Sequence, residues 1–285
     1  HELAFGLESL GYSQSEISAR VAEMASFFGI SNYFYKDVKD LSGGQKQLLN
    51  LAAVMTLQPS VLILDEPTSR LDPIAAYEFC QTLARINREF GTTIIISEHR
   101  FEEVLPISDR VVVMDKGRIV AIDAPDKIGY DLLKENNPMF NAMPPNFKVF
   151  YSINDDKEQR APVTVKDARA WLSDEMQRRN MNRVSINKSD DSVEDNSSPV
   201  IEAKGVWFRY TQSGADVLRD LSFKVKRGEF YAILGGNGAG KSTAVSVLCG
   251  INRPYRGKVK TAGGTNVALL PQNPQTLFSH KTVML

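Results

Sequence analysis

Apolar residues recur at helical spacing in three stretches of the first 91 residues. The first stretch follows a capping-box pair, Ser13 and Glu16, and ends at Gly29. The second runs from Gln45 to Gln58, and the third runs from Asp72 to Gly91. Their apolar stripes predict three amphipathic helices, with Ile17, Val21, Met24 and Phe28 inward in the first, Leu48, Leu51, Ala52 and Met55 in the second, and Ile74, Tyr77, Leu83 and Ile86 in the third.

Short continuous apolar runs alternate with these helices. Val61–Leu64, Thr92–Ile96 and Val111–Met114 are rich in β-branched or aliphatic residues and show no alternation of polar and apolar positions. A strand buried on both faces has this pattern, which is typical of a parallel sheet covered by helices on both sides. We therefore expect an α/β domain over residues 1–125.

The alternation of apolar helical stripes with short apolar runs is absent between Asp126 and Pro199 and resumes after Pro199. Chain breakers such as Asn136–Pro138 and Pro144–Asn146 predict a linker, partly disordered, with one helix near Lys166–Arg178. From residue 200 to 285 a second α/β domain is expected. Its predicted strands are Val200–Tyr210, Val217–Val225 and Glu229–Leu234.

Composition and charge exclude several classes of protein. The chain is 42% hydrophobic and 24% charged, as an ordinary globular protein is, and its 34 basic residues balance its 34 acidic ones. A binder of nucleic acid driven by net charge is therefore not expected. No apolar run approaches the roughly 18 residues of a membrane span. Cys80 and Cys249 lack metal-ligand spacing and fit a reducing compartment, with core packing as their role.

A glycine-rich loop follows the last predicted strand. It reads Gly-Gly-Asn-Gly-Ala-Gly-Lys-Ser-Thr and fits the pattern G-x-x-x-x-G-K-[ST]. Glycines let several backbone N–H groups converge on a polyphosphate at a helix N-terminus without Cβ clashes. A lysine there neutralises β- and γ-phosphates, and the following hydroxyl ligates Mg²⁺. The candidate nucleotide-binding residues are Gly235, Gly236, Asn237, Gly238, Ala239, Gly240, Lys241, Ser242 and Thr243.

Two adjacent carboxylates end the strand Val61–Leu64. Removing carboxylates from water at the end of a buried strand costs free energy unless they meet a cation, a water or hydrogen-bond donors. Asp65 suits the ligand shell of Mg²⁺, and Glu66 suits a general base that positions a water. Such a pair taken alone is also typical of a helix cap or a solvated turn.

Two further polar segments lie at the ends of predicted elements. Leu41–Gln45, reading Leu-Ser-Gly-Gly-Gln, offers a hydroxyl and glycine N–H groups to an anion, although a plain capped turn has the same composition. His99 follows the strand Thr92–Ile96. A lone histidine is usually structural, and we interpret His1 and His280 in that way.

The order of these motifs resembles that of the ATP-binding-cassette (ABC) ATPases. Residues 41–45, 62–67, 69–72 and 96–99 are similar to the signature, Walker B, D-loop and switch-histidine motifs of the family. Four motifs in register make the resemblance highly specific, and it covers nearly everything outside Asp126–Pro199. Arg70 departs from the small or amide residue that is usual in the D-loop, which leaves the contacts across that loop open.

The second domain adds the Walker A loop, a glutamine that resembles the Q-loop, Gln272, and an aromatic that resembles the adenine-stacking residue, Tyr210. The resemblance implies an α/β P-loop NTPase fold of the ABC type, with a parallel-sheet core and a helical subdomain. It also implies ATP and Mg²⁺ as cofactors. The implied roles are phosphate binding by the Walker A loop, Mg²⁺ near Ser242, Gln272 and Asp65, catalysis by Glu66, His99 and Gln272, and contacts from a facing cassette by Ser42, Gly43, Gly44 and Gln45.

These motifs are split between two partial cassettes. The first domain has the signature, Walker B and His99 without a Walker A before them, and the second has Walker A and Gln272 without a signature after them. We expect a piece of a tandem-cassette protein, with a circularly permuted cassette as the alternative. An ATP bound between such halves lacks the second cassette's glutamate and histidine, so weak or absent hydrolysis by this chain is expected.

Within the family, the segments Ser97–Arg100, Arg110–Met114, Pro271–Pro274 and Ala4–Leu7 are most similar to the ATPases of energy-coupling factor (ECF) and cobalt-type importers. This resemblance implies an ATPase on the cytoplasmic face of a membrane that drives uptake of a vitamin, a vitamin precursor or a metal ion. Its partners are then integral membrane subunits and a second cassette, without nucleic acid and without a membrane span of its own.

Two alternatives to an importer ATPase make different predictions about the sequence. A tandem ABC protein acting on ribosomes or nucleic acid predicts a strongly basic helical insertion between its cassettes, whereas residues 126–199 hold 11 Lys or Arg against 13 Asp or Glu. A module that senses nucleotide without turnover needs neither Glu66 nor His99, and both are present.

Overall fold

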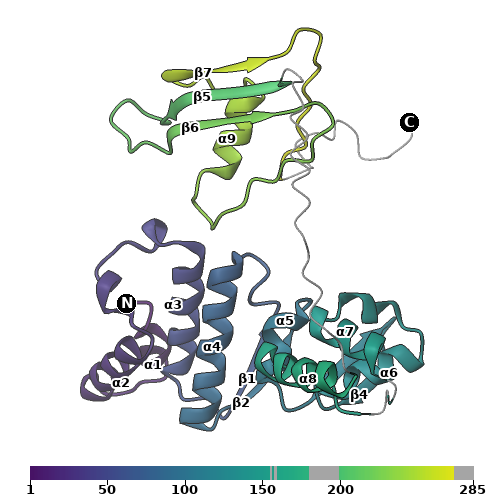
Figure 1. Cartoon of the computed structure of the whole chain (residues 1–285). Coiled ribbons are helices and arrows are strands. Elements are labelled where there is room, and N and C mark those ends of the chain that lie inside the picture. The colour runs from purple at the N-terminus through teal and green to yellow at the C-terminus, as the bar shows by residue number, and fades with distance from the viewer. Residues whose placement is uncertain (155, 157–158, 180–198, 273–285) are drawn as a thin grey trace, which may run out of the picture. The chain divides into compact units, whose positions relative to one another are not determined.

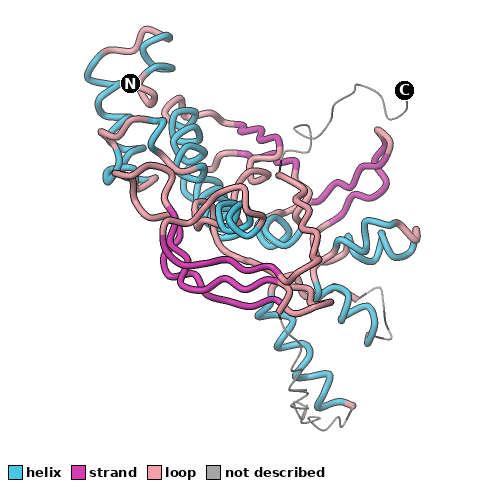
Figure 2. Tube along the Cα trace, turned by 90° about the horizontal axis from the view of Figure 1, so that it is seen from above, coloured by secondary structure: helices cyan, strands magenta, loops and turns pink. Residues whose placement is uncertain are grey.

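The computed structural model describes residues 1–154, 156, 159–179 and 199–272, and the chain divides into two compact units, His1–Ser185 and Ile186–Leu285 (Figure 1). Figure 2 distinguishes helices, strands and loops by colour. The first unit holds α1 (Phe5–Ser9), α2 (Gln14–Phe27), η1 (Ile30–Tyr33), η2 (Val38–Asp40), α3 (Gly43–Met55), β1 (Val61–Asp65), α4 (Pro73–Phe90), β2 (Thr93–Ser97), α5 (Phe101–Val104), η3 (Leu105–Ile107), β3 (Val111–Asp115), β4 (Arg118–Asp123), α6 (Ile128–Lys134), η4 (Pro138–Ala142), α7 (Pro145–Ile153) and α8 (Val165–Arg178). The second unit holds β5 (Ile201–Phe208), β6 (Leu218–Val225), α9 (Lys241–Leu248) and β7 (Arg256–Thr261).

The three helices predicted in the first 91 residues are confirmed, and α2 and α4 have the predicted ends, whereas α3 begins at Gly43 and ends at Met55 rather than running from Gln45 to Gln58. α2 begins at the capping box formed by Ser13 and Glu16. The Asp72 side chain accepts a hydrogen bond from the backbone N–H of Ala75 at the start of α4, and Gly91 ends that helix in the left-handed conformation. These caps satisfy backbone groups that the helices leave unpaired at their ends.

The inward face of α4 differs from the one predicted. Ile74 and Tyr77 are 67% and 58% exposed, whereas the positions beside them point into the unit. The residues of α4 that are buried are Ala76, Phe79, Cys80, Leu83 and Ile86. This set has the i, i+3, i+4, i+7 spacing of one helical stripe, so packing selected the stripe that contains Phe79 over the one that contains Tyr77.

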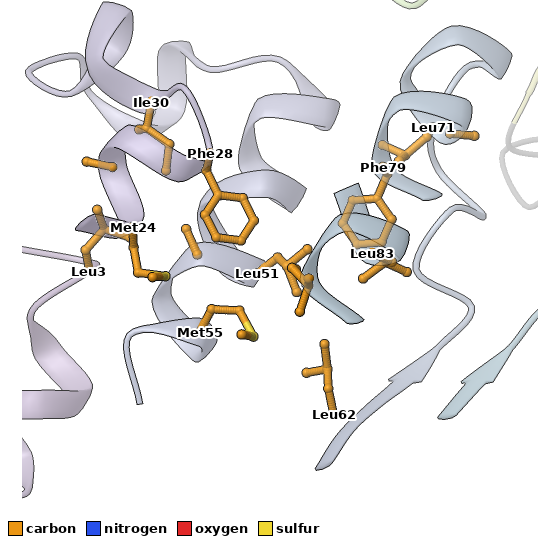
Figure 3. Close-up of a cluster of buried hydrophobic side chains, with 14 residues drawn as sticks. Leu3, Met24, Phe28, Ile30, Leu51, Met55, Leu62, Leu71, Phe79 and Leu83 are labelled. Carbon is orange, nitrogen blue, oxygen red and sulfur yellow. The ribbon is translucent and has the colours of Figure 1, made fainter. Parts of the chain in front are cut away.

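One hydrophobic core joins the helices of the N-terminal half to the first strand (Figure 3). Met24 from α2, Met55 from α3 and Phe79 from α4 are each 1% exposed. Leu62 of β1 lies in the same cluster, so this side chain anchors the strand against the helices. Burial of side chains of this size contributes about 1.5–3 kcal/mol each.

β1 and β2 pair in parallel, with register from Val61 opposite Thr93 to Asp65 opposite Ser97. Leu62 packs into the helical core, whereas Ile63 and Ile95 are 72% and 55% exposed. The prediction of a sheet covered on both faces therefore does not hold for the described residues of this unit, in which helices cover one face.

The prediction of a linker from Asp126 does not hold over the described residues 128–154 and 159–178. α6 and α7 share a second hydrophobic core with the hairpin β3–β4, in which Phe147 and Phe150 of α7 are both fully buried. The prolines taken as chain breakers instead begin helices, since Pro138 and Pro145 occupy the first turns of η4 and α7. The predicted helix near Lys166–Arg178 is confirmed as α8.

The strands of the second unit were predicted in part. β5 lies between β6 and β7, antiparallel to both, and α9 packs on this sheet through Ala244 and Val247. β7 was not predicted, and neither was β4 in the first unit. The strand expected at Glu229–Leu234 is irregular in the structure, with Phe230 98% exposed. A strand needs a hydrogen-bonded neighbour, and none pairs with this segment among the described residues.

Substitution of Gly129 tests whether α6 and α7 are packed together. A Cβ added at Gly129 would lie 2.7 Å from Cε2 of Tyr151 and 3.0 Å from Cδ1 of Phe147. We expect Gly129→Ala to lower the free energy of unfolding of the first unit by about 1–3 kcal/mol, because the rings must shift. Urea unfolding followed by Trp171 fluorescence, in a Trp207→Phe background, measures this change.

The matched control is Gly43→Ala, because a Cβ at Gly43 meets nothing within 4 Å. This substitution is expected to leave stability unchanged or to raise it by up to about 1 kcal/mol. Equal stability of the two variants would contradict the packing of α6 against α7.

Candidate functional site

The glycine-rich loop of the second unit leads directly into α9. Gly240 precedes the helix with φ at 89°, a left-handed conformation that favours glycine. A Cβ there would also lie 3.1 Å from the backbone oxygen of Val217. Glycine at this position therefore lets the loop turn sharply and direct the N-terminus of α9, with its unpaired N–H groups, toward the loop.

Lys241 folds over the same loop. Its Nζ donates hydrogen bonds of 2.7 Å to the backbone oxygens of Gly235 and Gly236. The ammonium group is thus held within the curve of the loop, where a phosphate group can compete with the carbonyls for it. The neighbouring Ser242 is exposed.

Tyr210 is tied to the loop by a hydrogen bond. Its hydroxyl lies 2.9 Å from Oγ1 of Thr243, which is itself buried. The Tyr210 ring makes an edge contact with Phe208 at 5.0 Å between centroids and remains 66% exposed. An exposed aromatic face beside the Walker A loop can stack on a flat ligand.

The Leu-Ser-Gly-Gly-Gln segment forms the start of α3. Ser42 is the N-cap and exchanges two hydrogen bonds with Gln45, at 3.2 Å from the Gln45 backbone N–H and 2.9 Å to its side-chain oxygen. Gly44 lies close to α4, because an added Cβ would be 3.2 Å from Cβ of Ala75. Both sequence interpretations of this segment survive, since a capped turn and an anion-binding helix N-terminus are the same structure here.

The parallel pairing of β1 with β2 brings the predicted acids and the histidine together. Ser97 donates from Oγ to Asp65 Oδ1 at 2.5 Å, and the Glu66 N–H donates to Ser97 at 3.1 Å. Oε1 of Glu66 lies 2.8 Å from Nε2 of His99. Glu66 has a φ of 43°, which is uncommon for a residue other than glycine and is held by these bonds.

Sequence reasoning missed the role of Glu98. Its Oε1 accepts hydrogen bonds from both the backbone N–H and the hydroxyl of Thr68, at 2.9 and 2.7 Å. Thr68 is 1% exposed and begins the segment that leads into Ser69–Asp72. Glu98 thereby links the turn after Glu66 to the strand end that carries His99. A carboxylate directly before the histidine was the available signal.

The remaining predicted residues are divided between the two units. Gln272 is exposed and lies outside any helix or strand. Asp65 belongs to the first unit, and Ser242 and Gln272 belong to the second. Among the described residues there is no group of three or more His, Cys, Asp or Glu side chains placed to hold a metal ion.

Substitution of Glu98 tests the link to Thr68. Glu98→Ala leaves the buried N–H and hydroxyl of Thr68 without their acceptor, which we expect to cost about 2 kcal/mol of unfolding free energy and to speed amide exchange at Thr68. Glu98→Gln keeps a carbonyl oxygen that can accept both bonds, so its cost is expected to be smaller. Hydrogen exchange by NMR and urea unfolding measure both effects, and equal losses in the two variants would refute this role.

Comparison with known protein families finds sequence similarity in both units. The sequence pattern of the ABC transporter family matches residues 4–69 and 218–284. An ABC transporter ATP-binding protein of Bacillus thuringiensis subsp. konkukian is 39% identical over 99% of this chain and 51% of its own length. One of Clostridium tetani is 32% identical over 99% of this chain and 63% of its own length. The chain thus spans about half to two thirds of the length of these relatives.

Among solved structures, CbiO1 of Clostridium perfringens, part of the ABC transporter complex CbiONQ, is 31% identical and matches 52% of this chain and 59% of its own with a TM-score of 0.43. No helix in the described ranges combines the length and the apolar character needed to cross a membrane. The chain has the α/β fold of ABC-type P-loop NTPases, and its sequence is similar to those of ABC transporter ATP-binding proteins.

Proposed function

We propose that this chain is the ATP-binding and hydrolysing part of an importer that couples ATP turnover to uptake of a small nutrient. The observation that carries the proposal is the contact of Glu66 with His99 at 2.8 Å, at the strand end that also bears Asp65. A binding-only module needs no carboxylate oriented by a histidine at this place. Hydrolysis needs a group that orients water and a second group that fixes its position.

The proposed chemistry relies on positioning and electrostatics rather than on a covalent intermediate. Lys241 would exchange its bonds to the Gly235 and Gly236 oxygens for β- and γ-phosphate oxygens, while the N-terminus of α9 donates N–H groups. Tyr210 would stack on adenine. Glu66 would accept a proton from the attacking water, and His99 would hold Glu66 and the γ-phosphate in place.

Mg²⁺ fits the oxygen donors available in the chain. Ser242 is exposed at the start of α9, Gln272 is exposed, and Asp65 keeps one carboxylate oxygen beyond the one that accepts from Ser97. When bound, the ion supplies positive charge against the β- and γ-phosphates. We propose Ser242 and Gln272 of the second unit, and Asp65 of the first unit, as Mg²⁺ contacts in the nucleotide sites of the parent protein.

In this proposal the signature residues Ser42, Gly43, Gly44 and Gln45 serve a nucleotide held by a facing cassette. The N-terminus of α3 is formed and capped, so it can meet the γ-phosphate without rearrangement. The facing cassette is the second half of the same parent protein or a homologue. Membrane subunits, contacted from the cytoplasmic face, would contain the path for a vitamin, a vitamin precursor or a metal ion, as the similarity to ECF and cobalt-type importers implies.

Nucleotide binding by the purified chain is the first test. We expect Mg-ATP to bind and Lys241→Ala to weaken binding about tenfold or more, because a charge-assisted contact to phosphate is lost. Lys46→Ala is a matched control, since Lys46 is a lysine of the first unit that bonds the backbone oxygen of Lys39. Isothermal titration calorimetry measures the affinities, and equal affinity in both variants would contradict the Walker A assignment.

Hydrolysis is the second test, with the wild-type chain compared with Glu66→Gln. We expect ATP to bind to both and turnover to be weak or absent, because the two units carry complementary rather than complete motif sets. Robust steady-state turnover that Glu66→Gln lowers by about 10²-fold or more would refute this expectation, and would show that Glu66 and Lys241 serve one nucleotide in a permuted or swapped cassette. Failure of the chain to bind ATP at all would overturn the proposed function.

A further inference from the structure

The Tyr210 ring is held by few direct contacts. Its hydroxyl bonds Thr243 and its edge meets Phe208, yet the ring remains 66% exposed. An exposed side chain loses rotamer freedom when a ligand orders it, and this loss weakens binding. The backbone beside Tyr210 therefore affects how well the ring can stack on a base.

An ion pair closes the connection from β5 to β6, which carries this tyrosine. Nε of Arg209 lies 3.4 Å from Oδ1 of Asp216, and Nη1 of Arg209 donates to the backbone oxygen of Gln212 at 3.0 Å. Next to Asp216, the N–H of Val217 donates to the backbone oxygen of Phe208 at 2.8 Å. The two ends of the connection are thus held together by side chains and by backbone.

Tyr255 ties this connection to the chain beyond α9. Its hydroxyl donates a hydrogen bond of 2.8 Å to Oδ1 of Asp216, the same oxygen that faces Arg209. The guanidinium of Arg209 also lies over the Tyr255 ring, with 4.3 Å between Cζ and the ring centroid. The backbone N–H of Tyr255 in turn bonds the oxygen of Trp207 at 3.2 Å. One tyrosine therefore contacts both members of the ion pair.

The common effect of these contacts is on geometry. Each contributes little to stability by itself, because the side chains are partly exposed to water. Together they restrict Arg209 from two directions, and Arg209 is joined to Tyr210 by a peptide bond. A base that stacks on Tyr210 then meets a ring whose backbone is already ordered, so binding loses less conformational entropy.

We propose that Tyr255 is a positioning residue for the adenine base, which acts through Asp216 and Arg209 to hold Tyr210 ready to stack. This inference rests on the proposed function, in which Tyr210 stacks on adenine. It assigns Tyr255 no contact with the phosphates. The glycine-rich loop should therefore bind a polyphosphate equally well without the Tyr255 hydroxyl.

Isothermal titration calorimetry with Mg-ATP and with Mg-tripolyphosphate separates the base from the phosphates. Tyr255→Phe removes the hydroxyl and keeps the ring beneath Arg209. We expect it to weaken ATP binding about threefold or more and to leave tripolyphosphate affinity within about twofold of the wild-type value. Tyr12→Phe is the matched control and should change neither affinity, because Arg20 likewise lies over the Tyr12 ring but in the first unit.

A double-mutant cycle with Tyr210→Ala tests whether Tyr255 acts through Tyr210. We expect Tyr210→Ala to weaken ATP binding, and Tyr255→Phe to have no further effect on ATP affinity in that background. Equal losses for ATP and tripolyphosphate, unchanged ATP affinity in Tyr255→Phe, or the same loss with and without Tyr210 would each overturn the inference while wild type still binds ATP. A wild-type chain that fails to bind ATP overturns the proposed function instead.

Discussion

The parallel pairing of β1 with β2 is the constraint on which the first unit depends. In this register Asp65 lies opposite Ser97, so the residues that follow both strands emerge at one edge. A shift of one residue would turn Leu62 out of the core and Ile63 into it. The core of α2, α3 and α4 therefore sets the register, and the register sets the distance between Glu66 and His99.

Turn geometry after β1 completes this arrangement. Glu66 occupies a left-handed conformation that a non-glycine residue adopts at some cost, and the bonds of its N–H to Ser97 offset that cost. Glu98 holds the next turn through Thr68. Two carboxylates from two strand ends thus stabilise each other's loops, one through a histidine and one through a buried threonine.

The second unit depends on the turn by which its glycine-rich loop leads into α9. Gly240 supplies the left-handed turn, and Lys241 binds the carbonyls of its own loop. Those two hydrogen bonds hold the ammonium group within the curve of the loop. Tyr210 is similarly held beside the loop by Thr243.

Local chemistry in the sequence determined the helices α2, α3 and α4 and the motif residues at their ends. Ser13, Ser42 and Asp72 cap these helices through contacts three residues away, and such contacts do not depend on the rest of the fold. The passage from the glycine-rich loop into α9 was visible for the same reason. The strand predicted before that loop, Glu229–Leu234, is irregular in the part of the chain that the structure describes, so spacing was sufficient for the helix and not for the strand.

Only the tertiary structure decided which apolar residues share a core. Phe147 and Phe150 lie between prolines and asparagines, and the sequence pattern suggested a linker, but packing on β3–β4 makes this segment a folded part of the first unit. Packing likewise placed Tyr77 outside and Phe79 inside on α4, and brought Glu98 to Thr68 across thirty residues. Long-range contacts have no local signature, because their free energy arises only when the segments meet.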